Sequence, residues 1–139
     1  MAAAGPPPLF TPTPETTPFW EGVRNHRLRL PRCRTCETYH FYPRSLCPRC
    51  WSRDLEWVTV SGRGRLHTFV INYRPPKPLG HGPMIVAIVE LDEGPHLMTE
   101  LVGVDPDPAV LRCDVPVEVV FEPPTAGVTL PKFRPRRAR

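Results

Sequence analysis

The chain has 139 residues, of which 40% are hydrophobic, and a net charge of +4. A chain of this length buries roughly two-thirds of its unfolded surface, which is enough for one modest core. The charge is unevenly divided: residues 21–53 carry eight Arg and two Glu, whereas residues 84–122 carry one Arg and nine Asp or Glu. The chain is therefore bipolar, and its net charge alone does not indicate a nucleic-acid-binding protein.

The first ten residues lack the basic segment and the long apolar run of a signal peptide. No window of 18 residues is apolar throughout, so we expect no membrane span. These features predict a cytoplasmic protein. In such a reducing compartment, paired cysteines are expected to bind a metal rather than to form disulfides.

The N-terminal segment, residues 1–30, is expected to be a flexible arm followed by a short amphipathic helix. Thr16 and Pro18 have the character of a helix start, with a hydroxyl N-cap and a proline in the first turn. Phe19 and Trp20 begin an apolar face that extends to Leu28. This helix either covers the edge of the domain or docks onto another subunit, and both hypotheses stay open.

Residues 33–50 contain two Cys-x-x-Cys pairs, Cys33 with Cys36 and Cys47 with Cys50. Two such pairs typically close a tetrahedron around a structural metal ion and leave no coordination position for substrate. We expect Zn²⁺, with iron in a rubredoxin-like site as the alternative. Glu37 and Trp51 occupy the positions after each pair, where glycine would relieve a tight turn.

The insert between the pairs, residues 37–46, is aromatic and basic. Aromatic residues beside arginines can stack on bases, which would indicate a nucleic-acid surface. We favour the alternative that the insert packs the small ribbon against the barrel, because so small a ribbon needs apolar cover from a neighbour. Cys113 stands apart from the other four cysteines and is expected to be a small buried residue.

The remainder of the chain is predicted to be mainly β. After a strand at residues 28–32, runs rich in β-branched and aromatic residues predict strands at 55–60, 65–73, 84–91, 96–104 and 115–122. Asp107 and Pro108 can cap one helical turn before the last strand. Five strands counted from Trp57 fit a small OB-fold barrel. The predicted domains are the arm and helix at 1–30, a zinc ribbon at 31–54, the OB-fold barrel at 55–124 and a basic, proline-rich tail at 125–139.

No catalytic constellation is evident. Ser45, Ser52 and Ser61 have no nucleophile-elbow context, and no glycine-rich loop fits a phosphate cradle. The five histidines (26, 40, 67, 81 and 96) form no spaced ligand set. We therefore expect a non-catalytic protein.

The combination of arm, ribbon and barrel resembles the acyl-CoA-associated family known as domain of unknown function thirty-five. The resemblance covers about residues 16–135. It rests on Phe19-Trp20, the four cysteines with Pro43, Arg44 and Pro48 between them, Trp57, Ser61-Gly62 and Gly64, Val89 to Gly94, and Leu130-Pro131 with Phe133-Arg134-Pro135. Members usually have a Gly-containing turn before the last strand, where this chain has Arg112, Cys113 and Asp114.

The resemblance implies an accessory subunit of a thiolase or of a thiolase-like aldolase of the lipid-transfer type. Such a subunit would stabilise the enzyme and help to bind acyl-CoA in lipid or steroid side-chain degradation. Phe19 and Trp20 would contact the partner. Candidates for the phosphates of CoA are Arg63, Arg65, Arg74, Lys77, Lys132 and Arg134. The alternative from another class is a single-stranded nucleic-acid-binding protein with an OB-fold and a zinc ribbon, which the acidic segment disfavours.

Overall fold

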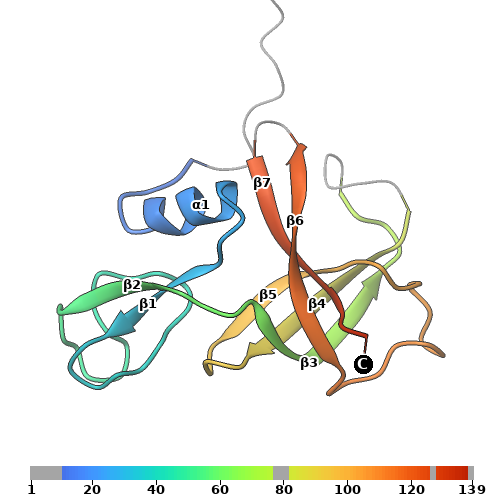
Figure 1. Cartoon of the computed structure of the whole chain (residues 1–139). Helices are drawn as coiled ribbons and strands as arrows, with labels where there is room; N and C mark the ends of the chain where they lie inside the picture. The colour runs from blue at the N-terminus through green and yellow to red at the C-terminus, as the bar shows by residue number, and fades with distance from the viewer. Residues whose placement is uncertain (1–10, 77–81, 126–127, 138–139) are drawn as a thin grey trace, which may run out of the picture. The chain divides into compact units, whose positions relative to one another are not determined.

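A computed structural model describes residues 11–76, 82–125 and 128–137 (Figure 1). The chain divides into two compact units. The first unit comprises the residues up to 60 together with 121–131, and the second comprises 61–120 together with the C-terminal residues from 132. Lys77 and His81 lie outside the described residues.

The first unit begins with a short helix, α1 (Thr17–Arg24). Phe19 and Val23 lie on its buried face. The helix is shorter than its apolar pattern predicted: it ends before His26, whose φ of 58° is left-handed. Leu28 is buried, as expected, but lies beyond the helix.

Two local features explain how α1 begins and ends. Thr16 occupies the N-cap position, but its hydroxyl does not cap the helix; it accepts a hydrogen bond from the backbone N–H of Thr13 at 2.9 Å instead. At the other end, the N–H of Arg27 donates to the carbonyl of Gly22 at 2.8 Å. A Cβ at Gly22 would lie 2.8 Å from the carbonyl oxygen of Arg27, so this close return requires glycine.

The ribbon of the first unit is a two-stranded antiparallel sheet of β1 (Arg29–Cys33) and β2 (Leu55–Thr59). Cys33 pairs with Leu55 at one end of this sheet and Arg29 with Thr59 at the other. Each Cys-x-x-Cys pair forms a tight turn, or knuckle. The strand pairing places the first knuckle next to the segment that follows the second knuckle. Leu30 is fully buried, which gives the ribbon an apolar anchor besides its cysteines.

The second unit is built around a five-stranded closed barrel in the order β3-β4-β5-β7-β6. The strands are β3 (Arg63–Asn72), β4 (Met84–Leu91), β5 (His96–Leu101), β6 (Pro116–Thr125) and β7 (Val128–Pro135). Leu101 on β5 pairs in parallel with Phe133 on β7, and this pairing closes the barrel. The mainly β class and the OB-type barrel predicted from the sequence are confirmed.

The assignment of the barrel strands differs from the prediction in one respect. The strand at residues 55–59 pairs with β1 in the ribbon and is not part of the barrel. The fifth barrel strand is β7, in the segment for which we expected a proline-rich tail. Proline has no backbone N–H to donate to a neighbouring strand, so it is rare within sheets. Because of Pro131 and Pro135, we predicted a tail here and not a strand.

The barrel core is formed by alternate residues of its strands. Leu66, Val89, Leu97, Val117 and Phe133 are at most 2% exposed. Buried residues of β4 alternate with residues that are half-buried or, at Glu90, exposed, whereas its continuous apolar run predicted burial on both faces. Before β6, Asp107 caps a turn, as predicted: its carboxylate accepts a hydrogen bond from the N–H of Ala109 at 2.8 Å. The prediction that Cys113 is buried is wrong, because its side chain is exposed.

Among the described residues, no helix is long and apolar enough to cross a membrane.

A substitution at Gly64 on β3 tests how closely the strands of the barrel pack. A Cβ at Gly64 would collide with the carbonyl oxygen of Glu90 on the neighbouring strand β4. We expect Gly64→Ala to lower the free energy of unfolding by about 1–3 kcal/mol, because the strand backbones must separate. Chemical denaturation measures this change. Arg63→Ala, an exposed change next to it, is the control and should alter stability by less than about 0.5 kcal/mol; equal effects would refute the packing argument.

Candidate metal centre

The four cysteines predicted as ligands converge in the first unit. One ligand atom from each of Cys33, Cys36, Cys47 and Cys50 lies within 4.8 Å of the other three. The Sγ atoms of Cys33 and Cys50 are 3.5 Å apart, and those of Cys36 and Cys47 are 3.6 Å apart. A tetrahedral ion with metal–sulfur bonds of about 2.3 Å requires sulfur–sulfur distances of about 3.8 Å. The four side chains therefore fit one tetrahedral metal ion.

The ionisation of these thiols supports the same conclusion. Hydrogen bonds from the side chain and backbone of Thr38 lower the pKa of Cys36 to about 6. The pKa of Cys50 is raised to about 12: the backbone N–H of Ser52 acts to lower it, but burial and the three neighbouring sulfurs outweigh this effect. Four thiolates so close together repel one another, and a divalent cation removes that repulsion.

Backbone hydrogen bonds shape both cysteine knuckles. The N–H of Cys33 donates to the carbonyl of Thr38, and the N–H of Cys47 donates to that of Ser52, each at 2.9 Å. Glu37 and Trp51 have left-handed φ values of 61° and 66°. The absence of glycine at these two positions therefore leaves strain in both turns, which is of the order of 1 kcal/mol for each such residue.

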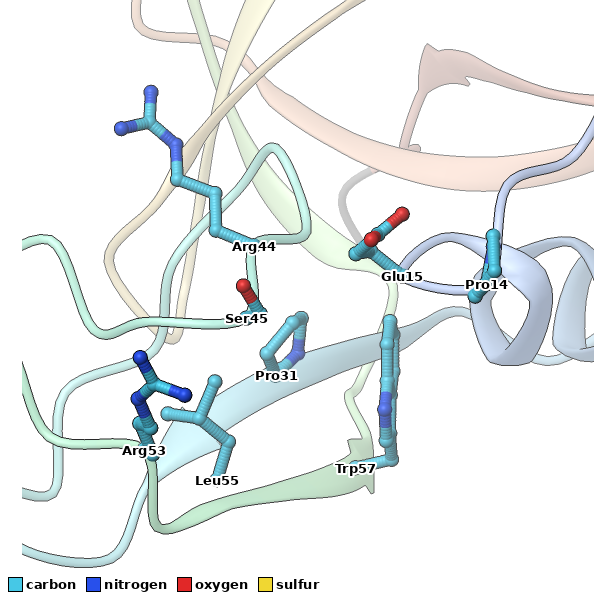
Figure 2. Close-up of a pocket in the computed structure, with 8 residues that line it drawn as sticks. All are labelled: Pro14, Glu15, Pro31, Arg44, Ser45, Arg53, Leu55 and Trp57. Atoms are coloured by element: carbon cyan, nitrogen blue, oxygen red, sulfur yellow. The ribbon is translucent and has the colours of Figure 1, made fainter.

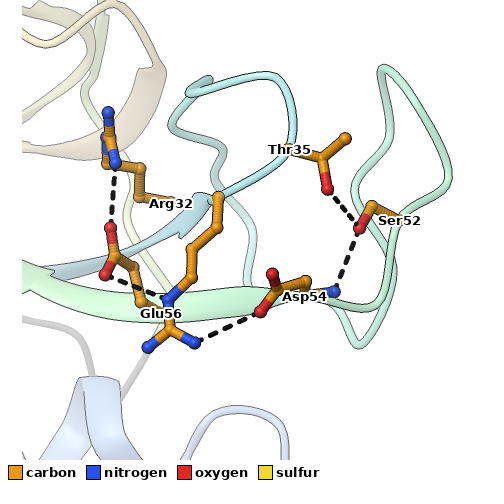
Figure 3. Close-up of polar contacts among 6 residues, drawn as sticks. Arg32, Thr35, Ser52, Asp54 and Glu56 are labelled. Carbon is orange, nitrogen blue, oxygen red and sulfur yellow. Dashed lines mark hydrogen bonds and ion pairs between the residues drawn. The ribbon is translucent and has the colours of Figure 1, made fainter.

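Polar contacts join the two knuckles and the strand that follows them (Figure 3). The hydroxyls of Thr35 and Ser52 lie 2.9 Å apart and connect one knuckle to the other. Glu56 on β2 accepts from Arg32 at 2.9 Å and from Arg34 at 3.3 Å. The Arg32 hydrogen bond is the main cause that lowers the pKa of Glu56. These contacts hold the ribbon in register around the cysteines.

The insert, residues 37–46, packs within its own unit. The rings of Phe41 and Phe19 have centroids 5.5 Å apart, so the insert contacts the buried face of α1. His40 is 6% exposed, and burial lowers the pKa of its ring. These observations favour packing over base stacking for this part of the insert. They also place Phe19, at 2% exposed, in the core, and make α1 a cover for its unit.

A shallow pocket of about 340 Å³ lies on the first unit (Figure 2). Pro31, Leu55 and Trp57 supply apolar walls. The charged lining residues are Arg44, Arg53 and Glu15. We did not predict a basic pocket here, although the arginine-rich composition of residues 21–53 was its signal in the sequence. Two guanidinium groups and one carboxylate leave this lining with a net charge of +1.

Among the described residues predicted to contact CoA, Arg74 lies far from Arg63 and Arg65. Arg63 and Arg65 are exposed at the start of β3, and Arg74 is exposed beyond its end, on the order of 30 Å along the strand. Lys132 pairs with Glu100 at 2.8 Å and Arg134 with Glu118 at 3.0 Å. Their role in binding CoA stays a prediction, as does contact of Trp20 with a partner.

A second group of ligand-type side chains was missed. His67, Glu90 and His96 each place a ligand atom within 4.8 Å of the other two on the surface of the second unit. The histidines form no spaced ligand set in the sequence, but the fold brings two of them together with Glu90. Their sequence separations match no known motif, because three different strands bring them together.

Fold and site together define a protein with a rubredoxin-like metal ribbon and an OB-type barrel. Residues 20–56 match the family model for the rubredoxin-like zinc ribbon domain of ChsH2, and residues 57–122 match the model for its C-terminal OB-fold domain. The chain belongs to this family, whose members also carry the name DUF35. The resemblance proposed from the sequence is confirmed.

Curated relatives include subunits of enzymes that act on CoA esters. The chain is 37% identical over 118 residues to a probable enoyl-CoA hydratase alpha subunit of Thermomonospora curvata, covering 84% of this chain and 36% of that protein. It is 34% identical to a DUF35 domain-containing scaffold protein of Methanothermobacter thermautotrophicus (77% and 81% covered). It is 29% identical to benzoylsuccinyl-CoA thiolase subunit BbsA of Thauera aromatica (80% and 69% covered). The chain thus spans about a third of the length of the hydratase relative.

Among solved structures, the chain is similar to a chain of the Ltp2-ChsH2(DUF35) aldolase. The TM-score is 0.81 at 32% sequence identity, and the match covers 91% of this chain and 98% of that one. The similarity therefore extends over almost the whole of both chains.

Removal of one cysteine ligand tests the metal centre. We expect Cys47→Ser to lose the bound metal and several kcal/mol of stability in the ribbon, because four-ligand zinc sites contribute roughly 10–16 kcal/mol in small peptides. Elemental analysis and thermal unfolding measure both effects. Cys113→Ser is the matched control, since Cys113 is exposed and lies outside the cluster. If Cys47→Ser keeps the same metal content per chain as Cys113→Ser, the four-cysteine assignment fails.

Proposed function

We propose that this chain is a non-catalytic partner subunit of a thiolase-like aldolase of the lipid-transfer type, or of a thiolase, in acyl-CoA degradation. The observation that carries the proposal is the match over 98% of a chain from an aldolase of the Ltp2-ChsH2(DUF35) type. The relatives named as a thiolase subunit and as a scaffold protein support the same kind of role. A steroid side-chain CoA ester is the substrate class that we assign to the complex.

The chemistry of the metal centre supports an accessory role. Four cysteine ligands fill a tetrahedral coordination sphere, so the ion has no open position at which to activate water or a carbonyl. We propose Zn²⁺ as the ion, with iron as the alternative that elemental analysis would reveal. When bound, the ion supplies structure: it fixes both cysteine knuckles, and with them the exposed side chains that the knuckles carry.

The hydratase activity named for the Thermomonospora relative is not part of the proposal. This chain spans 36% of that protein, so the activity can belong to the remaining length. We propose that the present chain corresponds to the accessory part of such proteins. It would bind an enzyme that supplies the reacting groups.

Trp51 is the side chain that we assign to the partner interface. It is 76% exposed, although it is a large aromatic residue, and its φ of 66° would suit glycine better. A tryptophan held in a strained, exposed position contributes little to its own fold. Tryptophans are among the residues that dominate binding energy at protein interfaces. Tyr42, which is 51% exposed on the insert, is a second candidate contact.

Basic residues are available for the phosphates of CoA. Lys132 and Arg134 already pair with acidic side chains. We therefore expect the exposed side chains of Arg63, Arg65 and Arg74 to contribute more to binding the CoA phosphates. The pocket with Arg44 and Arg53 adds two further guanidinium groups in the first unit. A subunit with these residues can contribute charge to a CoA site completed by its partner enzyme.

Co-purification tests the proposed function. The untagged chain is co-expressed with each tagged thiolase-like protein of its source genome, and the complexes are isolated through the tag. We expect one such protein to retain this chain in a fixed ratio and to lose stability or carbon–carbon lyase activity without it. Failure of every thiolase-like protein to retain the chain, with activities indifferent to its presence, would overturn the proposal.

Trp51 gives a sharper prediction with opposite effects on stability and binding. We expect Trp51→Gly to stabilise the isolated chain by about 1 kcal/mol, because glycine adopts a positive φ without strain. The same change should weaken binding to the partner by about 2 kcal/mol or more, as the loss of an interface tryptophan typically does. Thermal unfolding and a binding titration measure the two effects.

Met98→Gly is a suitable comparison for Trp51→Gly, because Met98 is 69% exposed but lies on a barrel strand. It should lower the stability of the isolated chain, since glycine weakens a strand. Unchanged partner affinity in Trp51→Gly would show that Trp51 is not an interface residue.

A further inference from the structure

His67, Glu90 and His96 form a compact group on the surface of the barrel. They lie on the neighbouring strands β3, β4 and β5, which run side by side in Figure 1. The Nε2 atom of His96 is 3.9 Å from the Oε2 atom of Glu90, and the ring centroids of His67 and His96 are 4.5 Å apart. All three side chains are exposed to solvent. Two imidazoles and one carboxylate therefore converge from three strands.

An irregularity in β3 brings His67 into this group. The pairing of β3 with β4 shifts between Leu66 and Thr68, so His67 is the extra residue of a β-bulge. Leu66 is fully buried, and both His67 and Thr68 are exposed, which interrupts the alternation of the strand. Bulges redirect side chains in this way and are frequent next to functional sites. Glu90 and His96 are brought together more simply, as direct cross-strand partners.

We propose that His67, Glu90 and His96 bind a first-row divalent transition-metal ion, such as Zn²⁺ or Ni²⁺, at a site separate from the four-cysteine centre. Imidazole nitrogen is a preferred ligand of these ions, and two histidines with one carboxylate form a recurring ligand set. The site takes no cysteine, which distinguishes its chemistry from that of the ribbon.

Metal binding requires the ligand atoms, which lie within 4.8 Å of one another, to move closer together. Ligand atoms about 2.1 Å from a tetrahedral ion are about 3.4 Å apart. The nitrogen–oxygen distance of 3.9 Å between His96 and Glu90 must therefore shorten by roughly 0.5 Å, which exposed side chains achieve by small rotations. Arg65 is the cross-strand partner of Glu90 on the other side. The positive charge of Arg65 disfavours a nearby cation, so the two imidazoles must supply much of the affinity for the metal ion.

Three protein ligands leave at least one coordination position of the ion open. An ion held here on an exposed face can accept water, an anion or a ligand group of another protein as its remaining ligand. This is the property that the closed four-cysteine centre lacks. The two centres would therefore serve different purposes, one internal and structural and the other open to the surroundings.

Calorimetric titration of the full-length chain with Ni²⁺ tests the proposal. The protein is untagged, carries Cys113→Ser and is prepared with one Zn²⁺ ion per chain, held at its cysteine centre, and with all excess metal removed, so that neither a tag nor a free thiol nor residual Zn²⁺ interferes with the probe. We expect one Ni²⁺ ion per chain, and no nickel–thiolate absorption. His67→Ala and His96→Ala should each raise the dissociation constant about tenfold or more. Glu90→Gln should raise it severalfold.

Controls separate this site from general histidine binding and from misfolding. In His26→Asn the new residue also tolerates the left-handed φ of 58° at this position. This variant should bind Ni²⁺ as the parent does. Each variant must also retain its zinc content and its unfolding temperature. The proposal is overturned if Ni²⁺ does not bind, if the three variants bind as the parent does, or if His26→Asn weakens binding equally.

Discussion

The first unit depends on the convergence of four cysteine sulfurs at a single point. Its paired strands, β1 and β2, are short, and the rest of the ribbon is turns. Such a segment has too little apolar area to fold on hydrophobic burial alone. The cation that fits between Cys33, Cys36, Cys47 and Cys50 replaces a larger core. It also holds Trp51 exposed, in a backbone conformation that costs energy.

The second unit is stabilised in a different way. Its barrel closes on a core of aliphatic side chains and Phe133. A closed barrel leaves no unpaired sheet edge, and its outer face is free to carry other groups. On that face a bulge in β3 adds His67 to the pair formed by Glu90 and His96. The first unit thus has a closed metal centre, and the one that we propose on the second unit is open.

The sequence predicts what is encoded locally and misses what depends on closure in three dimensions. The cysteine spacing identified the metal ligands, and hydrophobic runs identified most of the strands. We did not predict β7, because it contains two prolines. We assigned the strand-like run at residues 55–59 to the barrel, although it pairs with β1. The group of His67, Glu90 and His96 left no signal, because its members meet through strand pairing and a bulge.

We infer that the metal stabilises the ribbon, whereas the barrel is stabilised by its own apolar core. Hydrogen exchange of the full chain, followed by mass spectrometry before and after removal of the metal with a strong chelator, tests it most directly. The account predicts that amides of β1 and β2 lose their protection and that those of β3 and β4 keep theirs. Protection of β1 and β2 that survives removal of the metal would contradict the account. So would a simultaneous loss of protection in all four strands.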